Sequence, residues 1–421
     1  MMKSYDTEII SVGTELLLGH VTNTDARDIS EMLSRIGINV KYHTVVGDNP
    51  ERLAKCVETA KSRADIIITT GGLGPTCDDL TKEILAKSFG LELVKDQQTY
   101  DGLYEYIKNS CHFTPNNYKQ AYLPEGCTVF RNTCGTAPGC AFEKDGKVVV
   151  MLPGPPKECH AMFAVSAVPY LRRLSDEQIV SHSVHMFGIG ESAVDMEFRD
   201  EMNVMTNPTM APYAKECDCL VQITAKAESE QAAEAMIAPV VAHVKERMGD
   251  YAYGVDTDTL EQAVIALLTE KRLTFSAAES CTGGELAKRF TDLPGASAVF
   301  AGGVVTYTNA AKSKLLGIDS ALIEEKGAVS YEVAYEMAVR VREILGTDIG
   351  IGITGLAGPD GDDVHDVGTV FVSMSAGDKC YVRSLRMGAH RSRSFIRRMA
   401  GNHAYDMIRR YVTGLPVEMT K

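Results

Sequence analysis

Residues 65–79 read DIIITTGGLGPTCDD, and this stretch decides how the first part of the chain folds. The run from Asp65 to Thr70 predicts a buried strand, because short apolar, β-branched runs bounded by turn residues are typical of strands. The glycine-rich turn over residues 71–74 then leads into a helix that we expect to begin near Asp78. A strand, a tight turn and a helix in this order are typical of βαβ units. The stretch therefore predicts a mostly parallel sheet covered by helices.

The same alternation of strands and helices continues on both sides of this stretch. Strands over residues 8–12 and 38–45 and helices over 25–35 and 50–63 precede it, the last helix with Asn49 as its N-cap. The chain becomes polar between Leu174 and Gln178, and Asp258 is expected to cap a helix that opens a second α/β segment. The predicted fold class is α/β, with domains over 1–173, 178–254 and 257–415, the middle one a small α+β domain.

Composition narrows the classes of partner. The 421 residues include 43 Lys and Arg against 56 Asp and Glu, so the net charge of −13 disfavours nucleic acid and anionic membranes. No stretch approaches the ~18 apolar residues of a membrane span, and the amino terminus shows no export signal, so we expect a cytoplasmic protein. The 11 cysteines form no Cys-x-x-Cys pair, which indicates neither a disulfide framework nor a zinc site.

The glycine-rich turn also predicts a ligand site. Gly71, Gly72 and Gly74 lie between a strand and a helix, where backbone amides form a cradle for phosphate. Asp78 and Asp79 follow directly, and two carboxylates beside a phosphate repel it unless a divalent cation lies between them. A plain tight turn with an acidic helix cap is the alternative. Other polar loops, one of them over residues 116–120, are expected to converge at the same sheet edge.

A second set of motifs lies near the carboxy terminus. Residues 278–284 read AESCTGG, follow a predicted buried strand and are expected to open a helix, which places the Ser280 hydroxyl near amides suited to an oxyanion hole. A simple helix cap is the alternative. No histidine occurs in the conspicuous loops before His365, so Lys312, assisted by Tyr307, is the predicted base unless it is an ordinary solvated lysine. Cys281 lacks an evident partner and ranks below Ser280 as a nucleophile.

Arginines and glycines further on predict contacts to a nucleotide. A second glycine-rich turn spans Thr354 to Gly361 after an apolar strand. From Arg383 to Arg410 eight arginines accompany a single acid, Asp406, and some of them are expected to coat the last helix. Arg393 and Arg397 are four residues apart and share a helix face, so we predict that they bind phosphate.

These motifs resemble the competence/damage-inducible protein A (CinA) family. The matching segments in the first part of the chain are 12–19, 71–81, 116–121, 135–139 and 152–156, and those in the last part are 278–284, 294–297, 303–312, 327–330, 354–361 and 367–370. The resemblance implies a MoaB/MogA-like three-layer α/β first domain, a small KH-like α+β middle domain and a C-terminal α/β amidohydrolase domain. The last domain is similar to the stand-alone nicotinamide-nucleotide amidohydrolase, PncC.

For the last domain the resemblance implies hydrolysis of the carboxamide of nicotinamide mononucleotide (NMN) to nicotinate mononucleotide and ammonia, with no cofactor. Ser280, Tyr307 and Lys312 are then the catalytic residues. The implied substrate contacts are Cys281, Thr282, Gly283, Asn309, Thr354, Gly355, Gly358 and Arg393. One departure is His365-Asp366, which stands where the family usually has Lys-Pro, and we expect it to reduce or alter substrate affinity.

For the first domain the resemblance implies metal-dependent hydrolysis of the pyrophosphate of ADP-ribose, an activity of some family members. Asp78 and Asp79 are then ligands of a divalent metal of the Mg or Co type, and the implied substrate contacts are Gly71, Gly72, Gly74, Asn117 and Lys119. Asp25 stands where many relatives have Asn, so it either weakens anion binding or adds a metal ligand. The alternatives are a binding-only domain of the molybdopterin type and a non-catalytic competence or DNA-damage adaptor. We expect small nucleotides as partners, no nucleic acid, no membrane and a homodimer.

Overall fold

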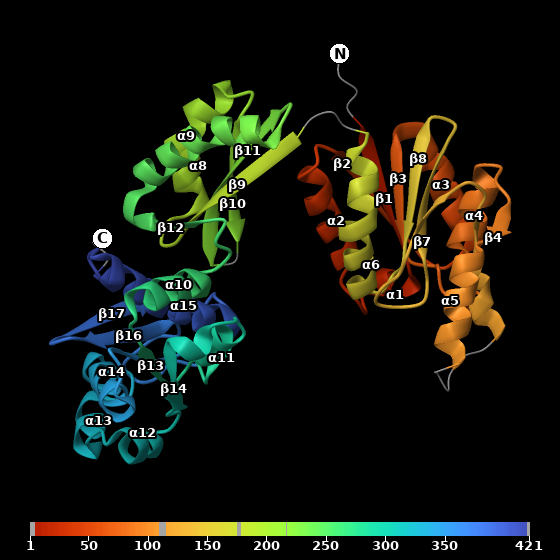
Figure 1. Cartoon of the computed structure of the whole chain (residues 1–421). Helices are drawn as coiled ribbons and strands as arrows, with labels where there is room; N and C mark the ends of the chain where they lie inside the picture. The colour runs from red at the N-terminus through yellow and green to blue at the C-terminus, as the bar shows by residue number, and fades with distance from the viewer. Residues whose placement is uncertain (1–4, 109–114, 175–177, 216, 419–421) are drawn as a thin grey trace. The chain divides into compact units, whose positions relative to one another are not determined.

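The computed structural model describes residues 5–108, 115–174, 178–215 and 217–418. The chain forms two compact units, Met1–Ser181 with Ala225–Met236, and His182–Thr224 with Ile237–Lys421. Figure 1 labels the helices and strands of both units.

The first unit is built on a six-stranded sheet in the order β2-β1-β3-β8-β7-β6 (Figure 1). The strands are β1 (Asp6–Val12), β2 (Asn39–Val46), β3 (Ile66–Thr70), β6 (Thr128–Phe130), β7 (Gly139–Lys144) and β8 (Lys147–Leu152). The first three and β8 pair in parallel, whereas β7 and β6 add to β8 in antiparallel fashion. A separate pair joins β4 (Leu93–Lys95) to β5 (Tyr122–Pro124). The strands predicted over 8–12, 38–45 and 65–70 are confirmed to within two residues at each end.

Helices cover both faces of this sheet, as expected for parallel strands that are buried on both sides. Ile9, Ile66 and Ile68 pack in one core with α2 (Thr24–Ser34) and α6 (Pro156–Met162). The alternate residues Ile10 and Ile67 pack in a second core with α3 (Pro50–Arg63) and α4 (Thr81–Ser88). Successive side chains of a strand point to opposite faces, so this division gives three layers. The remaining helices of the unit are α1 (Thr14–Leu17), α5 (Gln97–Lys108), the 3₁₀ turn Pro115–Ala121 and α7 (Val168–Arg172).

The middle of the chain forms the predicted α+β fold. Its four-stranded sheet has the order β10-β11-β9-β12, from β9 (Gln178–Met186), β10 (Thr209–Lys215), β11 (Asp218–Ala227) and β12 (Ala252–Val255). The helices are α8 (Glu191–Val204) and α9 (Glu230–Met248). Glu201 of α8 pairs with His243 of α9 at 3.0 Å, and Glu197 pairs with Arg247, so ion pairs tie the two helices together.

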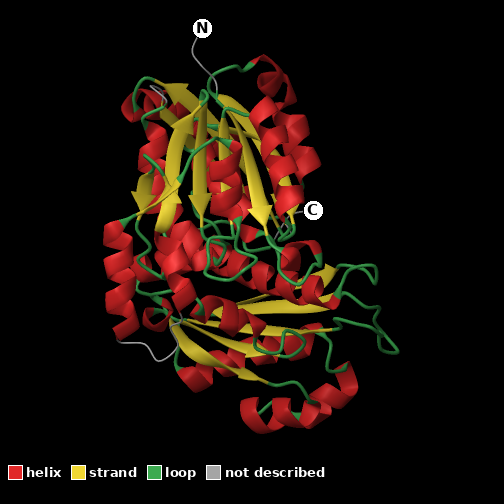
Figure 2. Cartoon of the chain, turned by 90° about the vertical axis from the view of Figure 1, so that its right-hand side faces the viewer, coloured by secondary structure: helices red, strands yellow, loops and turns green. Residues whose placement is uncertain are grey.

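The last part of the chain is a five-stranded sheet in the order β14-β13-β15-β16-β17. β13 (Phe275–Glu279) pairs in parallel with β14 (Phe300–Val305) and β15 (Ile349–Gly355), while β16 (Thr369–Ala376) and β17 (Lys379–Arg386) continue the sheet in antiparallel fashion. One core holds α10 (Leu260–Lys271), α11 (Glu285–Thr291) and α15 (Arg393–Thr413), and a second holds α12 (Asn309–Leu316), α13 (Ser320–Lys326) and α14 (Tyr331–Leu345). Figure 2 shows helices in red beside the yellow strands.

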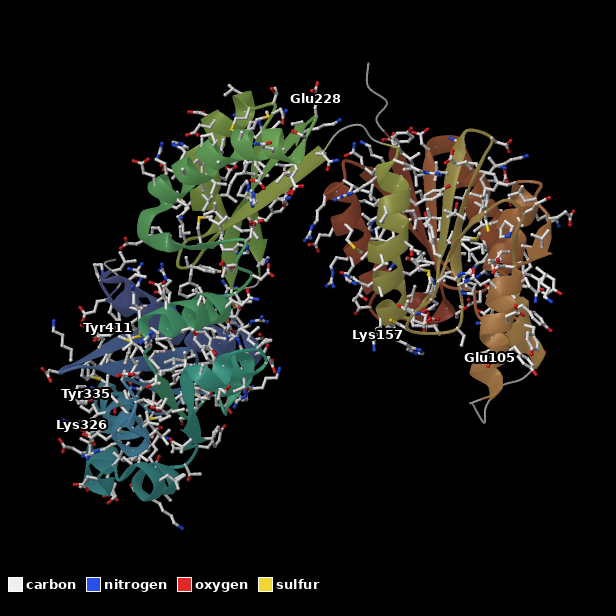
Figure 3. All side chains as sticks on the ribbon, in the orientation of Figure 1. Glu105, Lys157, Glu228, Lys326, Tyr335 and Tyr411 are labelled. Carbon is white, nitrogen blue, oxygen red and sulfur yellow. The ribbon has the colours of Figure 1, made fainter. Side chains whose placement is uncertain are left out.

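A glycine allows one helix to pack closely on this sheet. Gly352 lets α14 approach β15 closely, because a Cβ there would lie 2.6 Å from the Ala334 carbonyl oxygen. The prediction that Asp258 caps α10 is wrong: Thr259 is the N-cap, and its side chain accepts the Gln262 amide at 3.3 Å. Figure 3 draws the side chains on the ribbon: Tyr411 of α15 is partly buried against the core, whereas Tyr335 of α14 is exposed. No helix among the described residues is long and apolar enough to span a bilayer.

Candidate functional sites

The carboxy-terminal motifs meet at one edge of the five-stranded sheet. β13, β14 and β15 are parallel, so the residues that follow their carboxyl ends lie side by side. Ser280 follows β13, and its amide donates to the Ile353 carbonyl of β15 at 2.9 Å. Thr306 follows β14, and its amide donates to the Glu279 carbonyl at 2.8 Å. Backbone pairing therefore fixes the positions of the predicted catalytic segments.

Ser280 and Lys312 form a buried pair. The Lys312 Nζ lies 3.0 Å from the Ser280 Oγ and donates a second hydrogen bond, of 2.9 Å, to the Thr306 carbonyl. Lys312 is 1% exposed and Ser280 is 7% exposed. Burial lowers the pKa of Lys312, so a larger fraction of the amine is neutral and able to accept a proton. Lys312 is therefore not the solvated lysine that the sequence also allowed.

The turn after Ser280 differs from the prediction. Helix α11 begins at Glu285 rather than directly after Ser280, and its first amides are already engaged. The buried Glu279 carboxylate accepts the amides of Gly284, Leu286 and Ala287 at 3.0, 3.1 and 2.9 Å. Free helix amides therefore do not form the oxyanion hole, because Glu279 satisfies them.

Within the turn itself, the Gly283 amide donates to the Ser280 carbonyl at 3.0 Å, so it too is engaged. Gly283 has a φ of 59° and Gly284 one of 90°, which other residues rarely adopt. Among the described residues no carbonyl or carboxylate oxygen accepts the amides of Cys281 and Thr282. These amides directly follow the serine, and they are the donors that remain for an oxyanion.

The neighbouring thiol is a poor nucleophile. Cys281 is 6% exposed, and burial raises its pKa to about 12, so the thiol stays protonated near neutral pH. This result agrees with the ranking of Cys281 below Ser280.

Arg393, Tyr307 and Gly358 come together beside this pair. Arg393 donates to the Gly358 carbonyl and, at 3.2 Å, to the Tyr307 hydroxyl. Tyr307 is 59% exposed, and the hydrogen bonds of the described residues include none between Tyr307 and Ser280. Of the other predicted contacts, Asn309 begins α12 at the surface and Gly355 ends β15. Thr354 is buried, and its hydroxyl donates to the Ala328 carbonyl at 2.8 Å.

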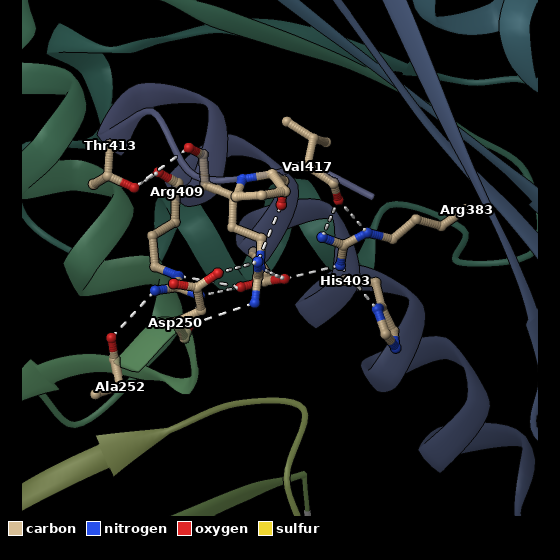
Figure 4. Close-up of polar contacts among 10 residues, drawn as sticks. Asp250, Ala252, Arg383, His403, Arg409, Thr413 and Val417 are labelled. Atoms are coloured by element: carbon tan, nitrogen blue, oxygen red, sulfur yellow. Dashed lines mark hydrogen bonds and ion pairs between the residues drawn. The ribbon is translucent and has the colours of Figure 1, made fainter. Parts of the chain in front are cut away.

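Three of the clustered arginines are buried rather than spread over the last helix. Asp406 of α15 is 0% exposed and accepts hydrogen bonds from Arg383, Arg409 and Arg410 (Figure 4). Arg409 also donates to the backbone carbonyls of Asp250 and Ala252, at 2.8 and 3.2 Å. This cluster joins the middle segment to α15 and leaves these guanidinium groups unavailable to a nucleotide.

The front motifs surround a cavity of about 580 Å³ in the first unit. The loops predicted to converge there do so: the lining includes Gly13, Asp48, Gly71, Gly72, Gly74, Thr136 and Pro153 to Pro156. Asn117 and Lys119 are not among the lining residues. The Lys119 amine instead bonds the Asp79 and Thr76 carbonyls and lies 3.3 Å from the Glu83 carboxylate.

Six carboxylates line this cavity, and its lining includes no Lys, Arg or His among the residues that the structure describes. The acids are Glu15, Asp25, Asp48, Asp78, Asp79 and Glu158. Asp78 and Asp79 lie in the turn before α4, which begins at Thr81 rather than near Asp78. The carboxylates of Asp78 and Asp79 both lie within hydrogen-bond distance of the Thr76 hydroxyl, and the hydrogen bond from Thr76 to Asp78 lowers the pKa of Asp78.

The donor set fits a divalent cation only in part. No group of three or more His, Cys, Asp or Glu among the described residues is arranged to hold a metal ion. Mg²⁺ commonly binds through one or two carboxylates and takes its other ligands from phosphate and water. Asp78 and Asp79 therefore suit a metal that binds together with a phosphorylated ligand.

Asp25, the residue that departs from the usual Asn, and Gln120 both line this cavity. Asp25 hydrogen-bonds Cys159, and burial, together with the nearby Asp28, raises the pKa of Asp25 to about 6. Gln120 is 1% exposed, and its Oε1 has no hydrogen-bond partner among the described residues. In the second site the role of Glu279 was missed in the sequence, although an acid at the end of an otherwise apolar strand was a visible signal.

These features define an α/β protein with a buried serine–lysine pair at one sheet edge and an acidic, glycine-lined pocket on another sheet. Residues 257–412 match the CinA C-terminal domain, residues 8–173 a probable molybdopterin binding domain and residues 181–254 the damage-inducible protein CinA KH domain. The chain belongs to the CinA family. The predicted fold class is confirmed: a MoaB-like first domain, a KH-like middle domain and an α/β last domain.

Relatives of this chain match it over nearly its whole length. A CinA-like protein of Desulfovibrio desulfuricans is 48% identical over 414 residues, which cover 98% of this chain and 97% of that protein. A putative competence-damage inducible protein of Thermoanaerobacter pseudethanolicus is 44% identical over 413 residues, covering 98% and 99%. The crystal structure of a CinA protein from Thermoplasma acidophilum is 34% identical and covers 39% of this chain and 96% of its own, with a TM-score of 0.37.

Proposed function

We propose that the carboxy-terminal site is a serine–lysine amidohydrolase that converts NMN to nicotinate mononucleotide and ammonia. The observation that carries this proposal is the buried 3.0 Å contact between Lys312 Nζ and Ser280 Oγ. A serine becomes a nucleophile when an adjacent base takes its proton, and a desolvated lysine serves as that base. The resemblance of the surrounding motifs to nicotinamide-nucleotide amidohydrolases supplies the substrate.

The geometry supports the following reaction. Lys312 takes the hydroxyl proton while the Ser280 Oγ attacks the carboxamide carbon, and the amides of Cys281 and Thr282 stabilise the oxyanion. The proton then passes to the leaving nitrogen, with the assistance of Tyr307, and ammonia departs from an acyl-serine. Water attacks this ester and gives up a proton to Lys312, and Lys312 returns that proton to the Ser280 Oγ as nicotinate mononucleotide leaves. No step in this sequence needs a cofactor.

Arg393 is the proposed phosphate ligand of this site. It is exposed and donates to Tyr307 and Gly358, and this position beside the predicted catalytic tyrosine supports a role in holding the nucleotide phosphate. We expect Arg393→Ala to raise KM for NMN about 10–100-fold, because a hydrogen bond to a charged group contributes about 1.5–3 kcal/mol. Steady-state ammonia release measures this change, with nicotinamide riboside, which has no phosphate, as the control substrate. A variant that loses NMN and riboside turnover equally would contradict the assignment.

We further propose that the front pocket hydrolyses the pyrophosphate of ADP-ribose with a divalent cation. The wall of carboxylates without a Lys, Arg or His supports this proposal, because an anionic ligand needs a counter-charge there. Asp78 and Asp79 would hold the cation, which supplies charge neutralisation and a more acidic water. Gly71, Gly72 and Gly74 let the backbone approach the phosphates. The ligands we propose for the chain are thus small nucleotides, and the assembly a homodimer.

A pair of assays tests the front pocket separately from the rear site. We expect AMP from ADP-ribose only with added Mg²⁺ or Co²⁺, and Asp78→Asn or Asp79→Asn to remove that activity while ammonia release from NMN is unchanged. Glu143→Gln, an exposed acid on β7 outside the cavity lining, is the matched control. If no cation supports AMP formation, the binding-only or adaptor alternative replaces this proposal for the first domain.

A further inference from the structure

Arg397 of α15 is directed to the turn that follows Ser280. Its Nε and Nη2 donate to the Thr282 carbonyl at 3.1 and 2.6 Å, and its Nε lies 3.4 Å from the Glu285 carboxylate. The side chain is 30% exposed. A Cβ on Gly283 would lie 3.6 Å from the Arg397 Nη2, so the guanidinium also lies against this glycine. The fork of Arg397 therefore binds protein rather than standing free for a phosphate.

The contact with Thr282 fixes a particular peptide group. The Thr282 carbonyl and the Gly283 amide belong to the same planar peptide, and that amide donates to the Ser280 carbonyl at 3.0 Å. Arg397 and the Glu285 amide, which donates to the Thr282 carbonyl at 3.2 Å, hold one side of the plane, and the serine backbone holds the other. The following amide, that of Gly284, is held by Glu279 at 3.0 Å. The turn is thus anchored after Thr282 at every peptide up to the start of α11.

The amides that remain for the oxyanion are those of Cys281 and Thr282, which lie between Ser280 and this anchored part. Their directions depend on the orientation of the next peptide group, because neighbouring peptides share an α-carbon. An oxyanion hole stabilises the transition state only when its donors are already aimed at the developing charge.

We propose that Arg397 is a positioning residue of the amidohydrolase, which holds the Thr282–Gly283 peptide so that the amides of Cys281 and Thr282 face the reacting carbonyl. The proposal rests on the amidohydrolase function proposed above. The proposal gives the two neighbouring arginines different roles. Arg393 binds the substrate phosphate, whereas Arg397 affects the chemical step through the turn that follows Ser280.

Kinetics of the full-length chain with NMN separate these roles. We expect Arg397→Ala to lower kcat about 10–100-fold, less than the ~10²–10³-fold that removal of a whole oxyanion donor costs. KM should stay within about twofold, because ground-state binding is unaffected. Arg397→Lys keeps one donor and should recover part of kcat. Arg398→Ala, the exposed next residue on α15, is the matched control and should match the wild type.

A second measurement does not depend on NMN. An alkyl fluorophosphonate labels an activated serine and places its phosphoryl oxygen in the same oxyanion hole, so intact-mass kinetics report on the loop directly. We expect Arg397→Ala to slow labelling of Ser280 by a factor similar to the loss in kcat, with thermal melting confirming that the variant is folded. If the wild type is labelled but releases no ammonia, the substrate proposal fails and the positioning proposal survives.

Several results would overturn the proposed role of Arg397, and each can be told apart from the others. A raised KM with an unchanged kcat in Arg397→Ala would make Arg397 a substrate ligand and overturn the proposal. Unchanged kcat and labelling rates in a folded variant would overturn it as well. If Arg397→Ala fails to fold, Arg397→Lys is the test, and a folded lysine variant whose kcat and labelling rate both equal those of the wild type would contradict the proposal.

Discussion

Replacing Lys312 by methionine is expected to lower kcat for ammonia release from NMN by about 10²–10⁴-fold, the usual contribution of a general base. The side chain is buried and its amine is 3.0 Å from the Ser280 Oγ, so the apolar stem of methionine keeps the packing and removes only the base. Lys312→Arg is the sharper control, because its guanidinium has a pKa above ~12 and does not give up its proton near neutral pH. Both variants should be inactive, whereas an ordinary structural cation would tolerate arginine.

Substitutions of Ser280 and Lys312 should also have non-additive effects on kcat. The double variant Ser280→Ala, Lys312→Met is expected to be no slower than either single variant, since each removes the same activated nucleophile. Losses that multiply in the double variant would mean that Lys312 and Ser280 act independently, and the proposed proton transfer between them would be wrong.

The pH dependence follows from the lowered pKa of Lys312. The base must be neutral to accept a proton, so kcat should rise with pH and level off once the amine is deprotonated. Since burial lowers the pKa of this amine, the plateau should begin below the ~10.4 of a solvated lysine. A rate that falls as pH rises, or a plateau that begins only at or above ~10.4, would contradict a desolvated lysine base.

The second large effect is on stability. Asp406→Asn is expected to lower the free energy of unfolding by about 3–5 kcal/mol, because breaking a buried ion pair leaves the partner charges uncompensated. The Asp406 carboxylate is 0% exposed, and Arg383, Arg409 and Arg410 are each no more than 6% exposed. Urea unfolding of the full chain, followed by circular dichroism, measures the loss.

A control variant separates the effect of the buried Asp406 cluster on stability from the effect of losing a surface charge. Asp250→Asn removes a partner of Arg410 that is 49% exposed and 3.4 Å away, so it should lower the free energy of unfolding by less than about 1 kcal/mol.

The stability of the chain should also depend on pH through Asp406. Burial opposes ionisation of Asp406, but the arginines outweigh it, and the pKa of Asp406 is lowered. A lowered pKa stabilises the fold above the unfolded value of ~3.9 and loses this effect as pH falls through the folded value. The wild type should therefore lose stability below about pH 4, and Asp406→Asn should lose less.

The elements with strong patterns could be predicted from the sequence. The apolar run before Gly71 predicts a strand by its pattern, and β3 (Ile66–Thr70) lies within one residue of the predicted bounds 65–70. Serine caps, proline starts and glycine stops act locally, so they are visible in a single chain. The convergence of loops at the sheet edge follows in turn from the parallel strand order.

Long-range side-chain pairing could not be predicted in the same way. The sequence places Arg397 beside Arg393 on one helix face, but only the fold brings Thr282, 115 residues away, to its guanidinium. The burial of Asp406 among arginines depends on packing of α15 against the middle segment. The starts of α4 and α11 were predicted too early in the chain. Before α4 the Asp79 carboxylate accepts the Thr76 amide, and before α11 the Glu279 carboxylate accepts the Gly284 amide, so a turn precedes each helix.

Ammonia release by the full-length chain with NMN, measured side by side for the wild type and Ser280→Ala, tests the central claim most directly. We expect steady release by the wild type without added metal. Release by Ser280→Ala should be slower by a factor of about 10³ or more, because the acyl-serine cannot form. Circular dichroism and thermal melting of both proteins confirm that the comparison is between folded chains. No ammonia from the wild type, or an undiminished rate in Ser280→Ala, would contradict it.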